Sequence, residues 1–259
     1  MNDASLEVLH ESRAEDGTCF RITRLPQGYR AEWSRLLRLD ADQAGQELAR
    51  ERYGDVQSTR KLEQGAVPGL LGHLQGALHW HAAAVCWART PALMLLGDSG
   101  AGKSTLAAAL CVQGARFLGD DVVHVDAQEG WQCVRREERH AIRPDMARVL
   151  FDARQRKKAL FDAENMASRA PLGVIAQVVR GSALRFEPLS ARARVALLLR
   201  HLVRFALDDP ARLGRDLEVC LALAASVPMY TLVVPSLADL STERLARLLR
   251  RELRGVLSV

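Results

Sequence analysis

The chain has 259 residues, of which 48% are hydrophobic and 26% are charged. This composition is typical of a folded globular protein and argues against a disordered chain, collagen or a coiled-coil rod. The formal net charge is only +5, and the aromatic residues, 5% of the chain, do not alternate with basic residues in any stretch, so nucleic acid is not an expected partner.

Residues 1–65 are predicted to form a small N-terminal extension of strands and a helix. Alternating apolar and polar positions, as in Cys19 to Thr23, predict short antiparallel strands up to about residue 35. Asp40 to Arg52 is polar and predicts a helix that ends at Gly54. A segment with Gln, Ser and Gly then runs to Pro68 and is the only plausible linker. We therefore expect an N-terminal β/α extension at 1–65 and a main domain at 66–259.

The middle of the chain predicts a hairpin followed by a helix. Apolar residues at helical spacing predict a helix from Gly69 to Trp80. Strand-like runs at His81 to Ala88 and Ala92 to Leu96, separated by a turn, predict the hairpin. The next helix is expected from Lys103 to Gly114. Short strands follow at Arg116 to Leu118, Val122 to Val125 and Trp131 to Val134.

The last third of the chain predicts more strands and amphipathic helices. Strands are expected at Val174 to Val179 and Met229 to Val234, and helices at Arg192 to Leu207, Arg212 to Ala225 and Thr242 to Val256. Strands mixed with helices around one central β-helix-β unit indicate an α/β protein with a mixed sheet.

The cysteines and the uncharged segments indicate a cytoplasmic protein. The five cysteines are odd in number and contain no C-x-x-C pair, which predicts buried free thiols and no zinc site. The N-terminus lacks the basic start and apolar core of a signal peptide. The long uncharged run from Val219 to Ala238 is divided by Pro228 and Pro235, so we expect no membrane span.

One segment fits the phosphate-loop pattern G-x-x-x-x-G-K-[ST] at every fixed position: Gly97-Asp98-Ser99-Gly100-Ala101-Gly102-Lys103-Ser104. Its glycines let backbone N–H groups approach a phosphate chain, and the following helix adds its positive dipole end. Lys103 can neutralise the outer phosphates, and the Ser104 hydroxyl can ligate Mg²⁺. The alternative is a glycine-rich turn that binds nothing, but the apolar strand before the motif and the helix after it favour nucleotide binding.

Two adjacent carboxylates, Asp120 and Asp121, precede the strand at Val122 to Val125. Neighbouring side chains on an extended backbone point to opposite sides, so one can bind Mg²⁺ while the other faces the acceptor as a general base. The alternative interpretation is a solvated Asp-Asp turn.

The phosphate loop, the short helix to Gly114, Arg116 and Asp120-Asp121-Val122-Val123 together resemble the HPr kinase/phosphorylase family and its HPr-kinase-like relatives. The resemblance implies a P-loop kinase core similar to the HPr kinase C-terminal domain and PEP carboxykinase. It implies ATP and Mg²⁺ as cofactors and a serine hydroxyl as the acceptor. In the family a histidine opens the strand before the phosphate loop, which implies that His81 lies beside Asp120 and tunes its proton affinity.

The same resemblance assigns roles to the other site residues. Lys103 would stabilise the transferring phosphoryl group, Asp120 would be the base, and Ser104 with Asp121 would ligate Mg²⁺. The nucleotide-binding segment would run from Gly97 to Thr105, and Thr105 stands where HPr kinases carry a glutamate. A residue that contacts ATP or the acceptor is expected among Arg135, Arg136, Arg139 and Arg143, since arginine offers a planar fork of donors.

The chain departs from full HPr kinases in ways that bear on the acceptor. Its first 65 residues are too short for their separate N-terminal domain, and the glycine-rich signature segment associated with HPr recognition is not found. The more apt comparison is the HPr-kinase-like group found with bacterial biosynthetic clusters. We therefore predict a serine kinase acting on a peptide or protein, such as a biosynthetic precursor peptide. A small-molecule kinase for serine or a sugar and a non-catalytic ATP sensor are the alternatives. Because HPr kinases form hexamers, the resemblance is also compatible with a homo-oligomer.

Overall fold

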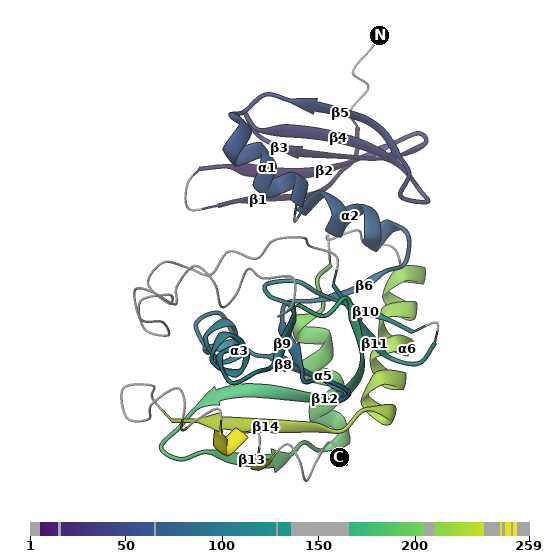
Figure 1. Ribbon diagram of the computed structural model, residues 1–259. Coiled ribbons are helices and arrows are strands. Elements are labelled where there is room, and N and C mark those ends of the chain that lie inside the picture. The colour runs from purple at the N-terminus through teal and green to yellow at the C-terminus, as the bar shows by residue number, and fades with distance from the viewer. Residues whose placement is uncertain are drawn as a thin grey trace. The chain divides into compact units, whose positions relative to one another are not determined.

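The computed structural model describes residues 6–14, 17–64, 66–127, 129–135, 166–204, 210–235, 244, 247–249, 251 and 252. The chain divides into an N-terminal unit, Met1–Leu78 with Arg204–Gly214, and a main unit, His79–Val203 with Arg215–Val259. The N-terminal unit carries an antiparallel sheet, and the main unit carries a mixed sheet with helices (Figure 1). The expected mixed α/β class with an N-terminal β-rich part is confirmed.

The sheet of the N-terminal unit is a five-stranded antiparallel meander. Its strands pair in chain order: β1 (Val8–Arg13), β2 (Cys19–Leu25), β3 (Gly28–Trp33), β4 (Leu37–Asp42) and β5 (Glu47–Arg52). The strands expected before residue 35 are confirmed. Alternation along the strands places Ile22, Ala31 and Leu39 in one buried cluster, as expected for a sheet with one covered face.

The helix expected from Asp40 to Arg52 is wrong, because this segment forms the β4–β5 hairpin. Asp42 shapes the turn: its backbone N–H donates to the Gln46 carbonyl at 2.9 Å, and its side chain accepts from the Gln46 N–H at 2.8 Å. Gly45 takes a φ of 79° there, which suits glycine. Pairing of β4 with β3 outweighs the helical propensity of these residues.

Two helices replace the expected linker. Helix α1 (Val56–Gln64) begins after Asp55, whose carboxylate accepts backbone N–H bonds from Gln57 and Ser58, both at 2.9 Å. Helix α2 (Ala66–Leu74) packs its apolar residues on the sheet through Val67, Leu70 and Leu74. The helix expected from Gly69 to Trp80 therefore ends at Leu74, and strand β6 (Leu78–Trp80) follows.

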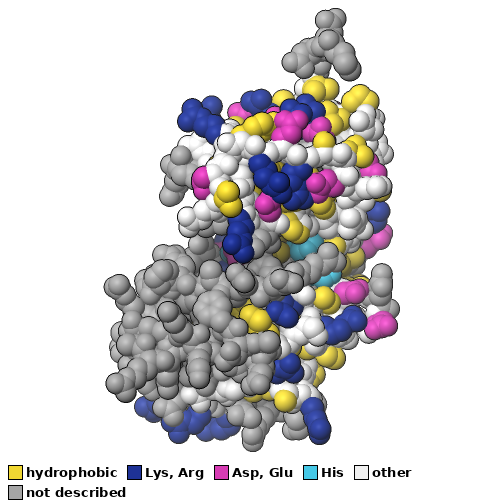
Figure 2. Space-filling model, turned by 45° about the horizontal axis from the view of Figure 1, so that its top comes forward, with side chains coloured by type: hydrophobic (Ala, Val, Ile, Leu, Met, Phe, Trp, Pro, Cys, Tyr) yellow, Lys and Arg dark blue, Asp and Glu magenta, His cyan; other side chains and the backbone are white. Residues whose placement is uncertain are grey.

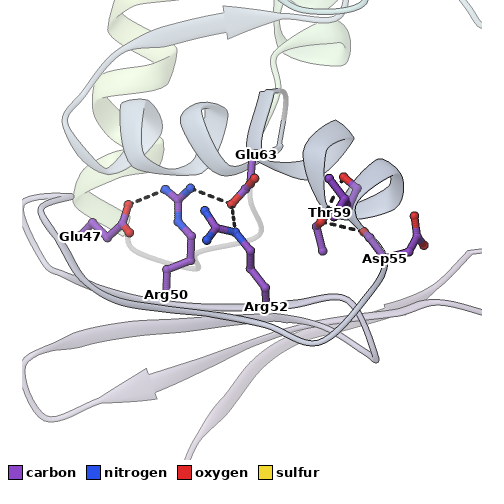
Figure 3. A network of polar contacts seen from close by, with 7 residues as sticks. Glu47, Arg50, Arg52, Asp55, Thr59 and Glu63 are labelled. Atoms are coloured by element: carbon purple, nitrogen blue, oxygen red, sulfur yellow. Dashed lines mark hydrogen bonds and ion pairs between the residues drawn. The ribbon is translucent and has the colours of Figure 1, made fainter.

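Helix α1 is also held to strand β5 by ion pairs (Figure 3). Glu63 of α1 accepts from the Arg52 Nε at 2.6 Å and from the Arg50 guanidinium at 3.2 Å. Arg50 also pairs with Glu47. The Arg52 hydrogen bond is the largest cause of a lowered pKa at Glu63. One carboxylate on α1 thus meets two guanidinium groups on β5.

Basic and acidic side chains are interspersed over the N-terminal unit on the face drawn in Figure 2. Cross-strand pairing explains the pattern: Arg30 binds both carboxylate oxygens of Asp40 at 2.8 Å, and Arg38 meets Glu51 at 2.7 Å. Such pairs neutralise one another locally and are expected to contribute little to folding stability.

The main unit is built on a nine-stranded mixed sheet. Its strand order is β6, β10 (Val123–Asp126), β11 (Gln132–Val134), β12 (Arg169–Arg180), β8 (Ala92–Leu96), β7 (Ala83–Cys86) and β9 (Arg116–Gly119), while β14 (Met229–Val234) pairs with β12 and with β13 (Arg185–Pro188). Strands β8 and β12 run parallel, and so do β12 and β14. The expected strands of this region are confirmed, whereas β6 and β13 were missed.

The predicted hairpin of β7 and β8 and the predicted helix α3 (Lys103–Val112) are also confirmed. Every β8 side chain is fully buried. Leu93 and Leu95 belong to the same cluster as Leu106 and Leu110 of α3. Figure 1 shows α3 on one side of these strands and helices α5 (Ala191–His201) and α6 (Pro210–Ser226) on the other. The strand that leads into the phosphate loop is therefore enclosed by packed core.

The last expected helix, Thr242 to Val256, lies mostly outside the described residues. The six described there, Arg244, Arg247, Leu248, Leu249, Arg251 and Glu252, are helical, and Leu249 is fully buried. All five cysteines are free thiols, and four of them are buried. No helix among the described residues is long and apolar enough to cross a membrane.

Candidate functional site

The phosphate loop lies at the carboxyl end of β8 and opens into a pocket of about 320 Å³. The pocket is lined by His81, Ser99, Gly100, Gly102, Lys103, Ser104, Thr105, Asp120, Asp121 and Arg180. It therefore collects every catalytic and metal-binding candidate from the sequence together with most of the expected nucleotide-binding segment.

Glycine is required at two points of the loop for different reasons. Gly97 has a φ of 146°, and a Cβ there would lie 2.9 Å from the Val178 carbonyl oxygen of β12. Gly102 caps α3 with a φ of 102°. Side chains are disfavoured in these conformations, so the glycines allow the tight passage from strand to helix.

Lys103 is buried, and its ammonium group donates to two carbonyl groups of the loop. Its Nζ lies 2.7 Å from the Gly97 oxygen and 3.2 Å from the Asp98 oxygen. Burial lowers the pKa of Lys103, while the carboxylates of Asp120, Asp121 and Asp98 act in the opposite direction. The loop backbone thus holds a cation at the pocket wall.

Ser104, in the first turn of α3, donates its hydroxyl hydrogen to the Asp120 carboxylate at 2.8 Å. Asp120 directly follows β9 and is 9% exposed. Two hard oxygen ligands from different elements therefore lie side by side, which is the kind of donor set that Mg²⁺ prefers.

His81 and Asp121 form a second pair in the same pocket. The His81 Nδ1 lies 3.0 Å from the Asp121 carbonyl oxygen and 3.2 Å from its carboxylate. Hydrogen bonding to Asp121 raises the pKa of His81, against the lowering effects of burial and of Lys103. Asp121 has a φ of 68°, an uncommon conformation outside glycine. The side chains of His81 and Asp121 are 41% and 83% exposed, so this pair faces solvent.

These contacts differ from the arrangement expected from the sequence. The Ser104 hydroxyl donates to Asp120, whereas Asp121 was expected to hold Mg²⁺ together with Ser104, and that metal role stays a prediction. His81 was expected beside Asp120, and its ion pair is formed with Asp121. Asp121 has a left-handed backbone conformation, which an extended-strand argument does not anticipate. The catalytic roles themselves stay predictions.

The last turn of α5 contacts both sides of the site. Arg200 pairs with Asp98 at 2.9 Å, with both side chains 67% exposed. The His201 carbonyl accepts the backbone N–H of His81 at 2.8 Å. Trp80 adds a buried hydrogen bond from its indole to the Leu198 carbonyl at 3.1 Å. These bonds fix the backbone position of His81.

Arg180 also lines the pocket and was not predicted from the sequence. It is the last residue of β12, which lies parallel to β8, and ligands of parallel sheets bind beyond the carboxyl ends of the strands. Its place at the carboxyl end of that strand is the signal from which Arg180 could have been identified as a site residue. Of the arginines considered from sequence, Arg135 contacts Met166, and Arg136, Arg139 and Arg143 lie outside the described residues.

The pocket's donors are compatible with a magnesium-bound nucleotide. Within the described part of the chain, no group of three or more His, Cys, Asp or Glu side chains could hold a metal ion. Mg²⁺ in nucleotide sites commonly takes one or two protein oxygens and completes its shell with phosphates and water. Ser104 and Asp120 meet that smaller requirement.

Comparison with known proteins gives likenesses among solved structures. No protein-family model and no curated protein sequence matches the chain. Among solved structures, the chain is similar to the Hpr(Ser) kinase/phosphatase from Coxiella burnetii, with 13% sequence identity and a TM-score of 0.34. The match covers 68% of this chain and 99% of that one.

Proposed function

We propose that this protein is an ATP- and Mg²⁺-dependent kinase with an HPr-kinase-like P-loop core, which transfers the γ-phosphoryl group to a serine hydroxyl of a peptide or protein. The observation that carries the proposal is that one pocket contains a phosphate loop and two aspartates with different partners. Asp120 is bonded to Ser104, and Asp121 is paired with His81. Phosphoryl transfer to a hydroxyl needs phosphate binding, a metal site and a base.

The phosphate side of the reaction is supplied by the loop and the first turn of α3. Backbone N–H groups from Ser99 to Ser104 bind the phosphate chain, and Lys103 moves its hydrogen bonds from loop carbonyls to phosphate oxygens. Ser104 and Asp120 would hold Mg²⁺, because their side-chain oxygens are adjacent. When bound, Mg²⁺ neutralises charge on the β- and γ-phosphates.

The acceptor side is supplied by Asp121 and His81. The Asp121 carboxylate takes the proton of the acceptor's serine hydroxyl. At the same time the serine oxygen bonds to the γ-phosphorus, and the bond from that phosphorus to the oxygen of the leaving ADP breaks. Protonated His81 orients the carboxylate and keeps it ionised until the proton is transferred. Relative to the assignment from sequence, the contacts favour an exchange of roles between Asp120 and Asp121.

The exposure of this pair supports a macromolecular acceptor. Asp121 is 83% exposed and His81 is 41% exposed at the side chain, so a serine on an extended peptide can reach them without entering a closed cavity. A biosynthetic precursor peptide is an acceptor of this kind. A kinase for free serine or a sugar is expected to enclose its small substrate more fully.

The experiment is label transfer from γ-labelled ATP with Mg²⁺, offered separately to a serine-containing peptide library and to a pool of free serine and sugars. We expect acceptor-dependent label in the peptide pool, and Lys103→Ala should reduce both nucleotide binding and transfer. Label found only in the small-molecule pool would show that the acceptor is a small molecule and would contradict the proposed peptide acceptor. Nucleotide binding with no transfer to either pool would instead indicate an ATP sensor and contradict the kinase.

A further inference from the structure

The guanidinium group of Arg180 lies over the phosphate loop. Its NH2 atom is 3.1 Å, and its Cζ 3.5 Å, from the place that a Cβ on Gly102 would occupy. Gly102 immediately precedes Lys103, and Arg180 lines the same pocket as both. The absence of a side chain at Gly102 is therefore what admits the guanidinium to this position.

The packing of β12 against β8 fixes where Arg180 emerges. Gln177 pairs with Leu96, the last residue of β8, and the Val178 backbone lies against Gly97. Arg180 follows at the same edge of the sheet, where the parallel strand leads into the phosphate loop. Its position is thus set by the core of the main unit.

Arg180 differs from the neighbouring charged residues in the partners of its side chain. Arg200 is paired with Asp98 and His81 with Asp121, and Lys103 is held by two carbonyls. Among the described residues, no carboxylate forms an ion pair with Arg180. A guanidinium held over a loop of N–H donors, without a carboxylate partner, fits an anionic ligand.

We infer that Arg180 is a second phosphate-binding cation of this site and that its planar fork binds two oxygens of the nucleotide's phosphate chain beside Lys103. The inference rests on the proposed nucleotide-binding function and adds a catalytic residue to it. Arginine suits the position because two parallel N–H donors can engage one phosphate group, whereas lysine supplies a point charge.

The test measures dissociation constants for Mg²⁺·ATP, tripolyphosphate and adenosine in the full-length wild type and in Arg180→Gln, Arg180→Lys and Arg185→Gln. Arg185 is the matched control, because it is an exposed arginine on β13 whose partner is Glu187. For Arg180→Gln we expect ATP and tripolyphosphate to bind about ten- to a hundredfold more weakly, as for loss of a charge-assisted hydrogen-bond pair. Adenosine binding should be unchanged, Arg180→Lys should be intermediate, and the control should match the wild type.

The outcomes distinguish a failure of the Arg180 assignment from a failure of the proposed nucleotide site. A wild type that binds ATP, with Arg180→Gln binding ATP and tripolyphosphate equally well, overturns the Arg180 assignment and leaves the proposed nucleotide site intact. A wild type that binds neither ligand overturns both. If Arg180→Gln does not fold, Arg180→Lys decides: weakened tripolyphosphate binding with unchanged adenosine binding supports the assignment, and unchanged binding of both overturns it.

Discussion

The Ser104 hydroxyl donates to the Asp120 carboxylate across 2.8 Å and so joins the first turn of α3 to the residue that follows β9. The two residues are brought together because α3 packs beside β7, β8 and β9 in one core cluster. The phosphate loop and a carboxylate thereby form a single polar site.

Replacing Ser104 should weaken the response to Mg²⁺. Ser104→Ala removes one oxygen ligand and the hydrogen bond that orients Asp120, so we expect the half-saturating Mg²⁺ concentration to rise by about ten- to a hundredfold, a range typical for changes around metal ligands. Ser104→Thr keeps the hydroxyl and is the matched control. A Mg²⁺ titration of label transfer measures both, and an unchanged midpoint in Ser104→Ala would remove Ser104 from the metal site.

His81 should titrate above its ordinary pKa of 6.5, because it is hydrogen-bonded to Asp121. In Asp121→Asn the charge of that partner is lost while burial and Lys103 still lower the pKa, so the pKa of His81 should fall relative to the wild type. NMR titration of the imidazole, assigned with His81→Gln, measures it. His73, whose pKa burial and nearby arginines lower to about 4, is an internal control that should not move.

The same pair predicts a direction for pH-dependent stability. The pKa of His81 is raised in the folded state, so the pair's contribution is fully present below about pH 6.5 and is lost as the pH rises through the raised value. A His81 midpoint that is the same in wild type and Asp121→Asn would contradict this coupling.

Gly97→Ala should destabilise the protein more than Gly114→Ala. Both glycines have positive φ angles, 146° and 88°, but only at Gly97 would the added Cβ meet a backbone atom, the Val178 oxygen at 2.9 Å. We expect a loss of about 1 kcal/mol for Gly114→Ala from the left-handed backbone alone. For Gly97→Ala we expect about 2 to 3 kcal/mol. Urea unfolding measures both losses. Equal losses would mean that β12 shifts away from the added Cβ at little cost in free energy.

Glu63→Gln should loosen α1 from β5. The carboxylate meets both Arg50 and Arg52, and we expect a loss of about 1 kcal/mol, since partly exposed ion pairs are screened by solvent. The folded-state pKa of Glu63 is lowered from 4.5, so the contribution is present above about pH 4.5 and is lost as the pH falls through the lowered value. Thermal unfolding at pH 7 and at pH 3 measures this, and a difference from wild type that is no smaller at pH 3 than at pH 7 would contradict it.

The strand, loop and helix around Gly97 to Ser104 were predictable because their signals are local. The apolar strand before Gly97, the loop glycines and the helix after Lys103 lie within one short stretch of chain, where spacing alone indicates the structure. The hairpin of β7 and β8 was found for the same reason. The left-handed backbone of Asp121 was not predictable in this way, because a single residue of positive φ has no counterpart in the spacing of the motif.

The missed features depend on contacts that are distant in sequence. The segment from Asp40 to Arg52 contains good helix formers, but pairing with β3 and the contacts of Arg50 and Arg52 with Glu63 stabilise strands. Arg180 is separated from the phosphate loop by many residues, and only the parallel pairing of β8 with β12 brings it there. Neither pairing is visible in the hydrophobic pattern of a single segment.

The most direct measurement of the central claim is acceptor-dependent label transfer, titrated with Mg²⁺, in wild type, Asp120→Asn and Asp121→Asn. If Asp120 holds the metal and Asp121 is the base, Asp120→Asn should require more Mg²⁺. Asp121→Asn should keep the wild-type Mg²⁺ midpoint but transfer label about a hundredfold or more slowly, within the range for loss of a general base. Wild-type rates and midpoints in both variants, or no transfer by the wild type to any hydroxyl acceptor, would contradict the account.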